Sequence, residues 1–121
     1  MAGEDSRVVI RPFTGDDYEF LAAVHYAVYQ DVPRSVTQWK HDDQTRDPTL
    51  LFVRHVVELG ERRVACGYFG HSPWIDDPDK YWVQILVLPE VADTRIRPQY
   101  LELALASIRS RKPVAVYTGM V

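Results

Sequence analysis

The stretch most suggestive of chemistry is VLPEVADTRIRPQYLELALASI (87–108), where an apolar run ends in a loop and an amphipathic helical pattern follows. Backbone N–H groups at the start of a helix can bind phosphate. Loops that do so usually contain glycine, which lets the backbone approach the ligand. This loop has none, but Arg95 and Arg97 carry guanidinium groups, which bind phosphate through paired hydrogen bonds. The loop is thus either a phosphate site that works through side chains or a solvated loop with two exposed arginines.

Pro98 bears on the same question because it has no backbone N–H to offer a ligand. Each lost hydrogen bond to a charged acceptor costs about 1.5–3 kcal/mol. The sequence therefore predicts weak phosphate binding, or none, at this loop.

Other reactive residue types do not form a recognisable site. The histidines are spread over separate predicted elements without the spacing of a metal site: His25, His41, His55 and His71. His55 falls on the apolar face of a strand, so we expect a buried, hydrogen-bonded imidazole. The acidic cluster at 76–79 is typical of a turn and lacks the glycine and ligand number of a calcium loop. Cys66 has no basic neighbour and is expected to be a small buried residue. No metal site is predicted.

Length and composition predict a single domain over residues 1–121. The net charge of −3 gives no electrostatic footprint for nucleic acid. The lone cysteine fits a reducing compartment, and no signal peptide or membrane-length apolar run is visible. We therefore expect a cytoplasmic protein that binds neither nucleic acid nor membrane.

The elements that must position the loop follow from hydrophobic periodicity. Strands are predicted at 7–13, 49–59, 64–70, 81–88 and 114–119, and helices at 14–30, 35–46 and 98–111. The run 81–88 is almost continuously apolar, as in a central strand buried on both faces. The unit 81–117 should form a right-handed parallel crossover, and the earlier strands should be antiparallel. The predicted fold is α/β (α+β-like), a mixed sheet of order β-α-α-β-β-β-α-β with helices on both faces.

Capping patterns support the helix starts. Thr14 with Asp17, and Ser35 with Gln38, have the spacing of capping boxes. Pro98 suits the first position of the last helix. The apolar side of that helix is predicted to consist of Leu101, Ala104, Leu105 and Ile108.

This order of elements resembles the GNAT superfamily of acyl-CoA-dependent N-acyltransferases. Three segments carry the resemblance: VIRPFTGDDYEFL (9–21), the hairpin VELGERRVACGYF (57–69), and VLPE (87–90) at the end of the fourth strand. It extends from about Val8 to Thr118. It implies transfer of an acyl group from acetyl-CoA, or another acyl-CoA, to an amine.

The pyrophosphate loop of that family, Gln/Arg-x-x-Gly-x-Gly/Ala, falls here on Ala92 to Arg97. Its first position is Ala92 and its glycine positions are Arg95 and Arg97, so none of the three matches. Long side chains would crowd the surface that glycine leaves open. The activity of this chain alone is therefore an open question at the level of sequence.

The resemblance also implies where substrates bind. The expected acyl-CoA contacts are Val87, Leu88, Thr94, Arg95 and Arg97. A backbone N–H at one of the first two would polarise the thioester. A small-molecule amine or peptide acceptor would bind beside the first two helices, near Tyr26 and Tyr29, with Trp39 and Trp74 as further aromatic candidates; core packing is the alternative for all four.

No catalytic residue can be assigned from the sequence. The fourth strand offers only Gln84, which cannot accept a proton, and the fifth offers Tyr117. Both are expected to pack or to make ordinary polar contacts.

The family fold continues after its fifth strand, whereas this sequence ends at Val121. We therefore expect a shortened domain or the N-terminal part of a longer or tandem protein. The strand at 114–117 should lie at a sheet edge and pair with a second copy, giving a homodimer, or with a following domain. Two alternatives to an enzyme stay open: a catalytically inactive GNAT-like module serving assembly or ligand sensing, and an unrelated mixed α/β binding domain if the fourth and fifth strands are not parallel neighbours.

Overall fold

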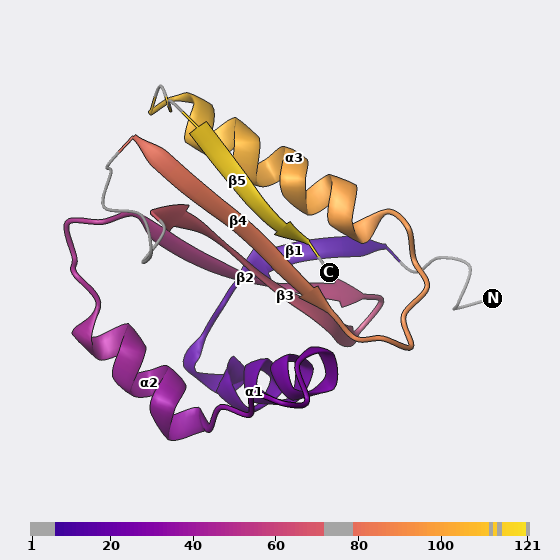
Figure 1. The fold of residues 1–121 in the computed structure, drawn as a ribbon. Coiled ribbons are helices and arrows are strands. Elements are labelled where there is room, and N and C mark those ends of the chain that lie inside the picture. The colour runs from indigo at the N-terminus through magenta and orange to yellow at the C-terminus, as the bar shows by residue number, and fades with distance from the viewer. Residues whose placement is uncertain (1–6, 72–78, 112, 114, 121) are drawn as a thin grey trace.

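The computed structural model describes residues 7–71, 79–111, 113 and 115–120. Within them one sheet carries helices on both faces (Figure 1). The elements are β1 (Val8–Pro12), the 3-10 turn η2 (Gly15–Asp17), α1 (Tyr18–Val28), α2 (Val36–Thr45), β2 (Phe52–Leu59), β3 (Arg62–His71), β4 (Lys80–Val87), α3 (Ile96–Arg109) and β5 (Ala115–Met120). The predicted order of strands and helices is confirmed.

The strands follow one another across the sheet in chain order. Pairs from β1 to β4 are antiparallel, and β4 pairs with β5 in parallel, with α3 as the crossover. The predicted parallel unit is therefore confirmed, which removes the reason for an unrelated mixed α/β domain. Within the described residues β5 lies at the sheet edge, as expected. Its pairing with a second copy or a following domain stays a prediction.

Each face of the sheet has its own core. Under α3 the buried residues include Val57, Val83 and Ile85. Under α1 they include Val24 and Leu86. Side chains alternate along each strand, so β2, β3 and β4 contribute to both cores.

Helix α3 differs from its predicted form in two respects. It begins at Ile96, two residues before Pro98, so the proline occupies the third helical position. The prediction that Pro98 starts the helix is wrong, although no intrahelical hydrogen bond is lost, since the first four N–H groups have no partner in the helix. The buried side is also rotated from the predicted one: it consists of Ile96, Tyr100, Ala104 and Ile108.

Both predicted capping patterns appear in the structure. The Asp17 carboxylate accepts hydrogen bonds from the N–H and the hydroxyl of Thr14, at 2.9 and 3.1 Å. Ser35 and Gln38 bond each other's backbone N–H with their side chains, at 2.7 and 3.1 Å. Asp17 is also buried and receives two 2.8 Å hydrogen bonds from the Arg11 guanidinium. The pair ties the start of α1 to β1.

No helix within the described residues is long and apolar enough to cross a bilayer. No group of three or more His, Cys, Asp or Glu residues in those ranges could hold a metal ion. Trp74, named as an aromatic candidate above, and residues 76–78 of the acidic cluster lie outside the described residues.

Candidate functional site

At the end of β4, the two backbone amides predicted to polarise a thioester, those of Val87 and Leu88, face in different directions. The Leu88 N–H donates to the Val64 carbonyl of β3 at 2.9 Å. Neighbouring residues of an antiparallel strand direct their N–H groups to opposite sides, so the Val87 N–H faces the β5 side. The β5 register ends with Met120 opposite Ile85, so no described β5 residue lies opposite Val87. Val87 is thus the better placed of the two amides.

The loop before α3 holds an internal ion pair at the predicted phosphate site. The Asp93 carboxylate accepts the backbone N–H of Arg95 at 2.9 Å and its guanidinium nitrogens at 2.5 to 3.1 Å. Hydrogen bonds from the guanidinium, and then from the backbone, lower the pKa of Asp93 to about 2, so it is ionised near neutral pH. A phosphate that binds Arg95 must therefore displace a carboxylate of the same loop.

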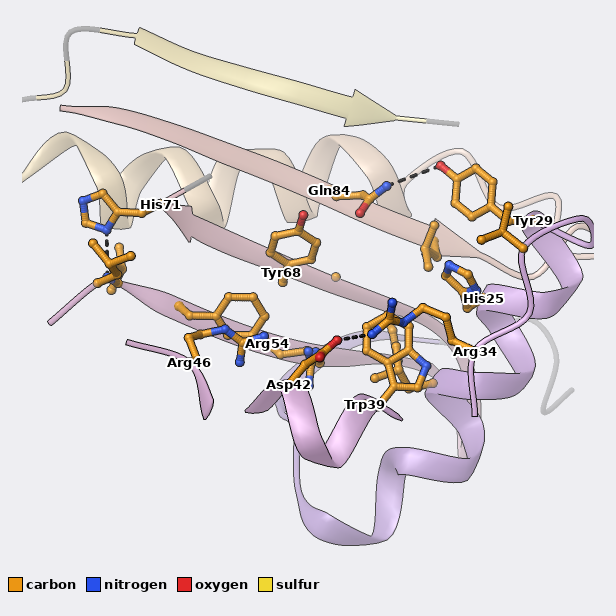
Figure 2. A pocket seen from close by; sticks show the side chains of 18 residues that line it. His25, Tyr29, Arg34, Trp39, Asp42, Arg46, Arg54, Tyr68, His71 and Gln84 are labelled. Atoms are coloured by element: carbon orange, nitrogen blue, oxygen red, sulfur yellow. Dashed lines mark hydrogen bonds and ion pairs between the residues drawn. The ribbon is translucent and has the colours of Figure 1, made fainter. Parts of the chain in front are cut away.

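A cavity of about 600 Å³ opens on the other face of the sheet, under α1, α2 and the segment between them. Figure 2 shows its lining side chains, which come from both helices and from β2, β3 and β4. Its volume lies within the range of small-molecule sites. On β4 the cavity reaches Gln84 and Leu86, the residues just before Val87.

Charged side chains in the cavity wall are held in two ion-pair groups. Arg34 pairs with Asp42. Arg46 and Arg54 share Asp43, through N–O distances of 2.7 Å each. Burial opposes ionisation of Asp43, but bonds from Arg54, Tyr18 and Arg46 outweigh burial and hold the pKa of its carboxyl below the usual value. Asp43 is therefore ionised near neutral pH.

Aromatic rings make up much of the rest of the wall. Phe52 stacks on Tyr68 with centroids 5.1 Å apart. The Trp39 ring packs edge-on against His25 at 5.4 Å and under the Arg34 guanidinium at 4.7 Å. Burial, and then the charge of Arg34, lower the pKa of His25, so its imidazole is neutral near pH 7. The cavity can thus hold a flat apolar group against charged neighbours.

The predicted acceptor residues separate in the structure. Tyr29 and Trp39 line the cavity, whereas Tyr26 does not and is 54% exposed. Gln84 donates to the Tyr29 hydroxyl at 3.3 Å, as expected of an ordinary polar contact (Figure 2). Tyr117 on β5 is exposed and outside the cavity lining.

The expectation for Cys66 is confirmed and that for His55 only in part. The His55 ring bonds the Tyr100 hydroxyl through Nδ1 at 3.0 Å, as expected, but the residue is half-buried; this partial burial lowers its pKa. Cys66 is buried, and burial raises the pKa of its thiol to about 12, so it is an inert thiol near neutral pH.

The sequence analysis missed the charged and aromatic part of the cavity wall: Arg34, Arg46, Phe52, Arg54 and Tyr68. One signal was present. His55 was placed on the apolar face of its strand, so Phe52 and Arg54 had to lie on the opposite face. Nothing in the sequence joined that face to α2.

Comparison with known proteins gives matches in structure only. No family model and no curated protein sequence matches the chain. Among solved structures, 54 chains match. An aminoglycoside N-acetyltransferase in complex with CoA has a TM-score of 0.68 at 10% identity, over 96% of this chain and 78% of that chain.

Two further structures are similar. A GNAT family acetyltransferase from Staphylococcus aureus has a TM-score of 0.59 at 11% identity, over 93% of this chain and 85% of that chain. A predicted acetyltransferase with acetyl-CoA from Clostridium acetobutylicum has a TM-score of 0.65 at 12% identity, over 95% and 80% of the two chains. At these identities the likeness concerns the fold alone.

Proposed function

We propose that this chain, which has the GNAT fold, transfers an acyl group from acetyl-CoA or another acyl-CoA to an amine held in the cavity. The observation that carries the proposal is the position of the cavity on β4. Gln84 and Leu86 line it, and the next residue, Val87, directs its N–H toward the β5 side. The acceptor site and the amide suited to a thioester thus meet within four residues of one strand.

The residues around the β4–α3 loop fit an acyl-CoA in kind. The first turn of α3 presents backbone N–H groups, and Arg95 adds a guanidinium close to them. Asp93 opposes the fit because it already engages Arg95. Acyl-CoA binding is therefore expected to be weaker than at a loop with a bare helix start.

The chemistry assigned to this chain is positioning and polarisation. When bound, acyl-CoA would supply a thioester: the amine nitrogen would attack its carbonyl carbon, the C–S bond would break as the amide forms, and CoA would leave as the thiol with the proton that the amine gives up. The Val87 N–H would donate to the carbonyl oxygen, where negative charge develops. The cavity wall would hold the neutral amine beside Gln84. No side chain is assigned as the base, since the cavity end of β4 offers an amide and no carboxylate.

Calorimetric titration with CoA and acetyl-CoA tests the binding half of the proposal. The Arg95→Ala/Arg97→Ala variant should bind more weakly, whereas Arg109→Ala, at the far end of α3, should bind like the unmodified chain. A CoA-release assay with a panel of amines then tests transfer. A dissociation constant of about 1 mM corresponds to a binding free energy of about 4 kcal/mol. The absence of binding at ligand concentrations up to about 1 mM would refute the proposal.

Binding without transfer would support the alternative, a catalytically inactive GNAT-like module that senses a ligand or serves assembly. We place the protein in the cytoplasm on the strength of its single, buried cysteine, Cys66.

A further inference from the structure

The cavity assigned to the acceptor, on the basis of the proposed function, has an excess of positive charge. Three guanidinium groups line it, those of Arg34, Arg46 and Arg54, and one carboxylate, that of Asp42. Asp43 adds a second carboxylate behind the wall. An acceptor with several positive charges would be repelled here, and one with a negative group would be attracted.

The second carboxylate has no capacity left for a ligand. Its Oδ1 accepts from Arg46 at 2.7 Å and from Arg54 at 3.2 Å. Its Oδ2 accepts from Arg54 at 2.7 Å and from the Tyr18 hydroxyl at 2.6 Å. A carboxylate has about four acceptor positions, so Asp43 is saturated. Arg54 is only 7% exposed and gives two hydrogen bonds to this carboxylate.

The Arg46 guanidinium makes fewer hydrogen bonds than that of Arg54 and is more exposed. Within the described part of the chain the Arg46 guanidinium makes one hydrogen bond, from NH1 to Asp43, and its side chain is 28% exposed in the cavity wall. A guanidinium has five N–H donors, so most of those of Arg46 can serve a ligand. The group lies 3.6 Å from the centroid of the Phe52 ring, which itself stacks on Tyr68. The Arg46 guanidinium is therefore held over the Phe52 ring, with donors left for paired hydrogen bonds to a ligand.

The opposite wall of the cavity, formed by α1, the start of α2 and the segment between them, also contains hydrogen-bond donors that no described residue satisfies. Three buried nitrogens have no hydrogen-bond partner among the described residues: His25 Nδ1, Arg34 Nε and Trp39 Nε1. The last two can only donate. Unpaired buried donors are costly, and a ligand oxygen could satisfy them only after a movement of the wall that exposes them. The wall thus holds unused donors at both ends of the cavity, and those at the Arg46 end are the accessible ones.

We propose that the acceptor is a small amine that carries a carboxylate. The carboxylate binds the Arg46 guanidinium, the carbon skeleton lies against Tyr68, and the amine reaches the Gln84 end of the cavity beside the thioester amide of Val87. Polycationic amines are poor acceptors for this chain.

The test compares matched amines that differ only in the carboxylate, such as 4-(2-aminoethyl)benzoate and phenethylamine, by calorimetry without acyl-CoA. Losing a hydrogen bond to a charged group typically corresponds to roughly a tenfold change in affinity. The carboxylated member should therefore bind at least that much more tightly. Arg46→Gln should abolish the preference, and Arg46→Lys should reduce it, since it keeps the charge without the fork. Arg62→Gln is the matched control, because Arg62 is an exposed arginine paired with Glu90 outside the cavity.

Equal binding of the two amines, tighter binding of phenethylamine, or a preference that survives Arg46→Gln would overturn the proposal. An amine with a phosphomonoester forms a third arm; if it binds more tightly than the carboxylated amine, the carboxylate assignment is wrong. The outcome is separable from that of the proposed function. An Arg46-dependent preference without acyl transfer would support the ligand class but not the reaction. Transfer to all amines alike would support the reaction but not the ligand class.

Discussion

Replacing Gly67 with alanine should displace Tyr100 and loosen helix α3. A β-carbon at residue 67 of β3 would lie 2.5 Å from Tyr100 Cε2 and 2.6 Å from Cζ. The ring cannot swing away freely, because Tyr100 has no exposed surface and its hydroxyl is bonded to His55 at 3.0 Å. Either the ring or the backbone of β3 has to move.

The size of the effect follows from the overlap. Carbon atoms pack best at about 3.5–4.0 Å, so the contact is too short by roughly 1 Å. Overpacking of this kind costs about 1–3 kcal/mol. In urea, with a slope of about 1–3 kcal/mol per molar, a loss of about 2 kcal/mol lowers the unfolding midpoint by roughly 1 M. Because Tyr100 belongs to the second turn of α3, acyl-CoA binding at the start of that helix should weaken as well.

Two comparisons separate this mechanism from a general effect of losing a glycine. Gly15→Ala is the matched control, because an added β-carbon there has nothing within 4 Å. In the background of Gly67→Ala, Tyr100→Leu should cost less than in the unmodified chain, with a coupling energy of about 1 kcal/mol or more. If Gly67→Ala unfolds at the same urea concentration as Gly15→Ala, or if the two changes are additive, the ring is not the constraint.

Four further predictions concern charge, hydrogen bonding and pH. Asp17→Asn should lower the free energy of unfolding in urea by about 3 kcal/mol, because it removes the charge of the buried carboxylate and breaks its ion pair with the Arg11 guanidinium. Since the pKa of Asp17 is held well below its usual value, this stability should be lost as the pH falls below about 4, and a pH-independent midpoint there would contradict the assignment. Asp93→Asn should strengthen acetyl-CoA binding in calorimetry by releasing Arg95, and weaker binding would show that the carboxylate organises the loop instead of competing with phosphate. Tyr100→Phe should cost about 1–2 kcal/mol in the same urea assay. Burial lowers the pKa of His55 in the folded protein, so stability should decline as the pH falls below about 6.5, and a flat profile between pH 7 and 5 would argue against burial of that ring.

The elements were predictable because their signals are local. Ser35 and Gln38 lie three residues apart, and the reciprocal bonds they make are complete before any tertiary contact forms. The apolar run of β4 likewise predicted a central strand, and a helix followed by another strand predicted the parallel crossover. Boundaries shifted by up to three residues, as at the start of β2, because they depend on which backbone partners a strand end finds.

The details that decide function depend on residues far apart in the chain. Tyr100 replaced Leu105 on the buried side of α3 because Gly67, 33 positions earlier, leaves space for a ring. Arg46 shares the cavity wall with Tyr68 and Gln84, which lie on β3 and β4, far from it in the chain. Periodicity ranks faces of one helix or strand, and it carries no information on which side chains of two elements meet.

The alternation of β4 explains how one strand can serve two substrates. Gln84 and Leu86 face the cavity under α1 and α2, whereas Ile85 and Val87 pack toward α3. A change under α3, such as Gly67→Ala, should therefore alter acyl-CoA binding through the helix start while leaving the Arg46 end of the cavity nearly unchanged. The two binding reactions should then respond to separate sets of substitutions, and only acyl transfer should respond to both, since transfer alone requires the two ligands to meet at the end of β4.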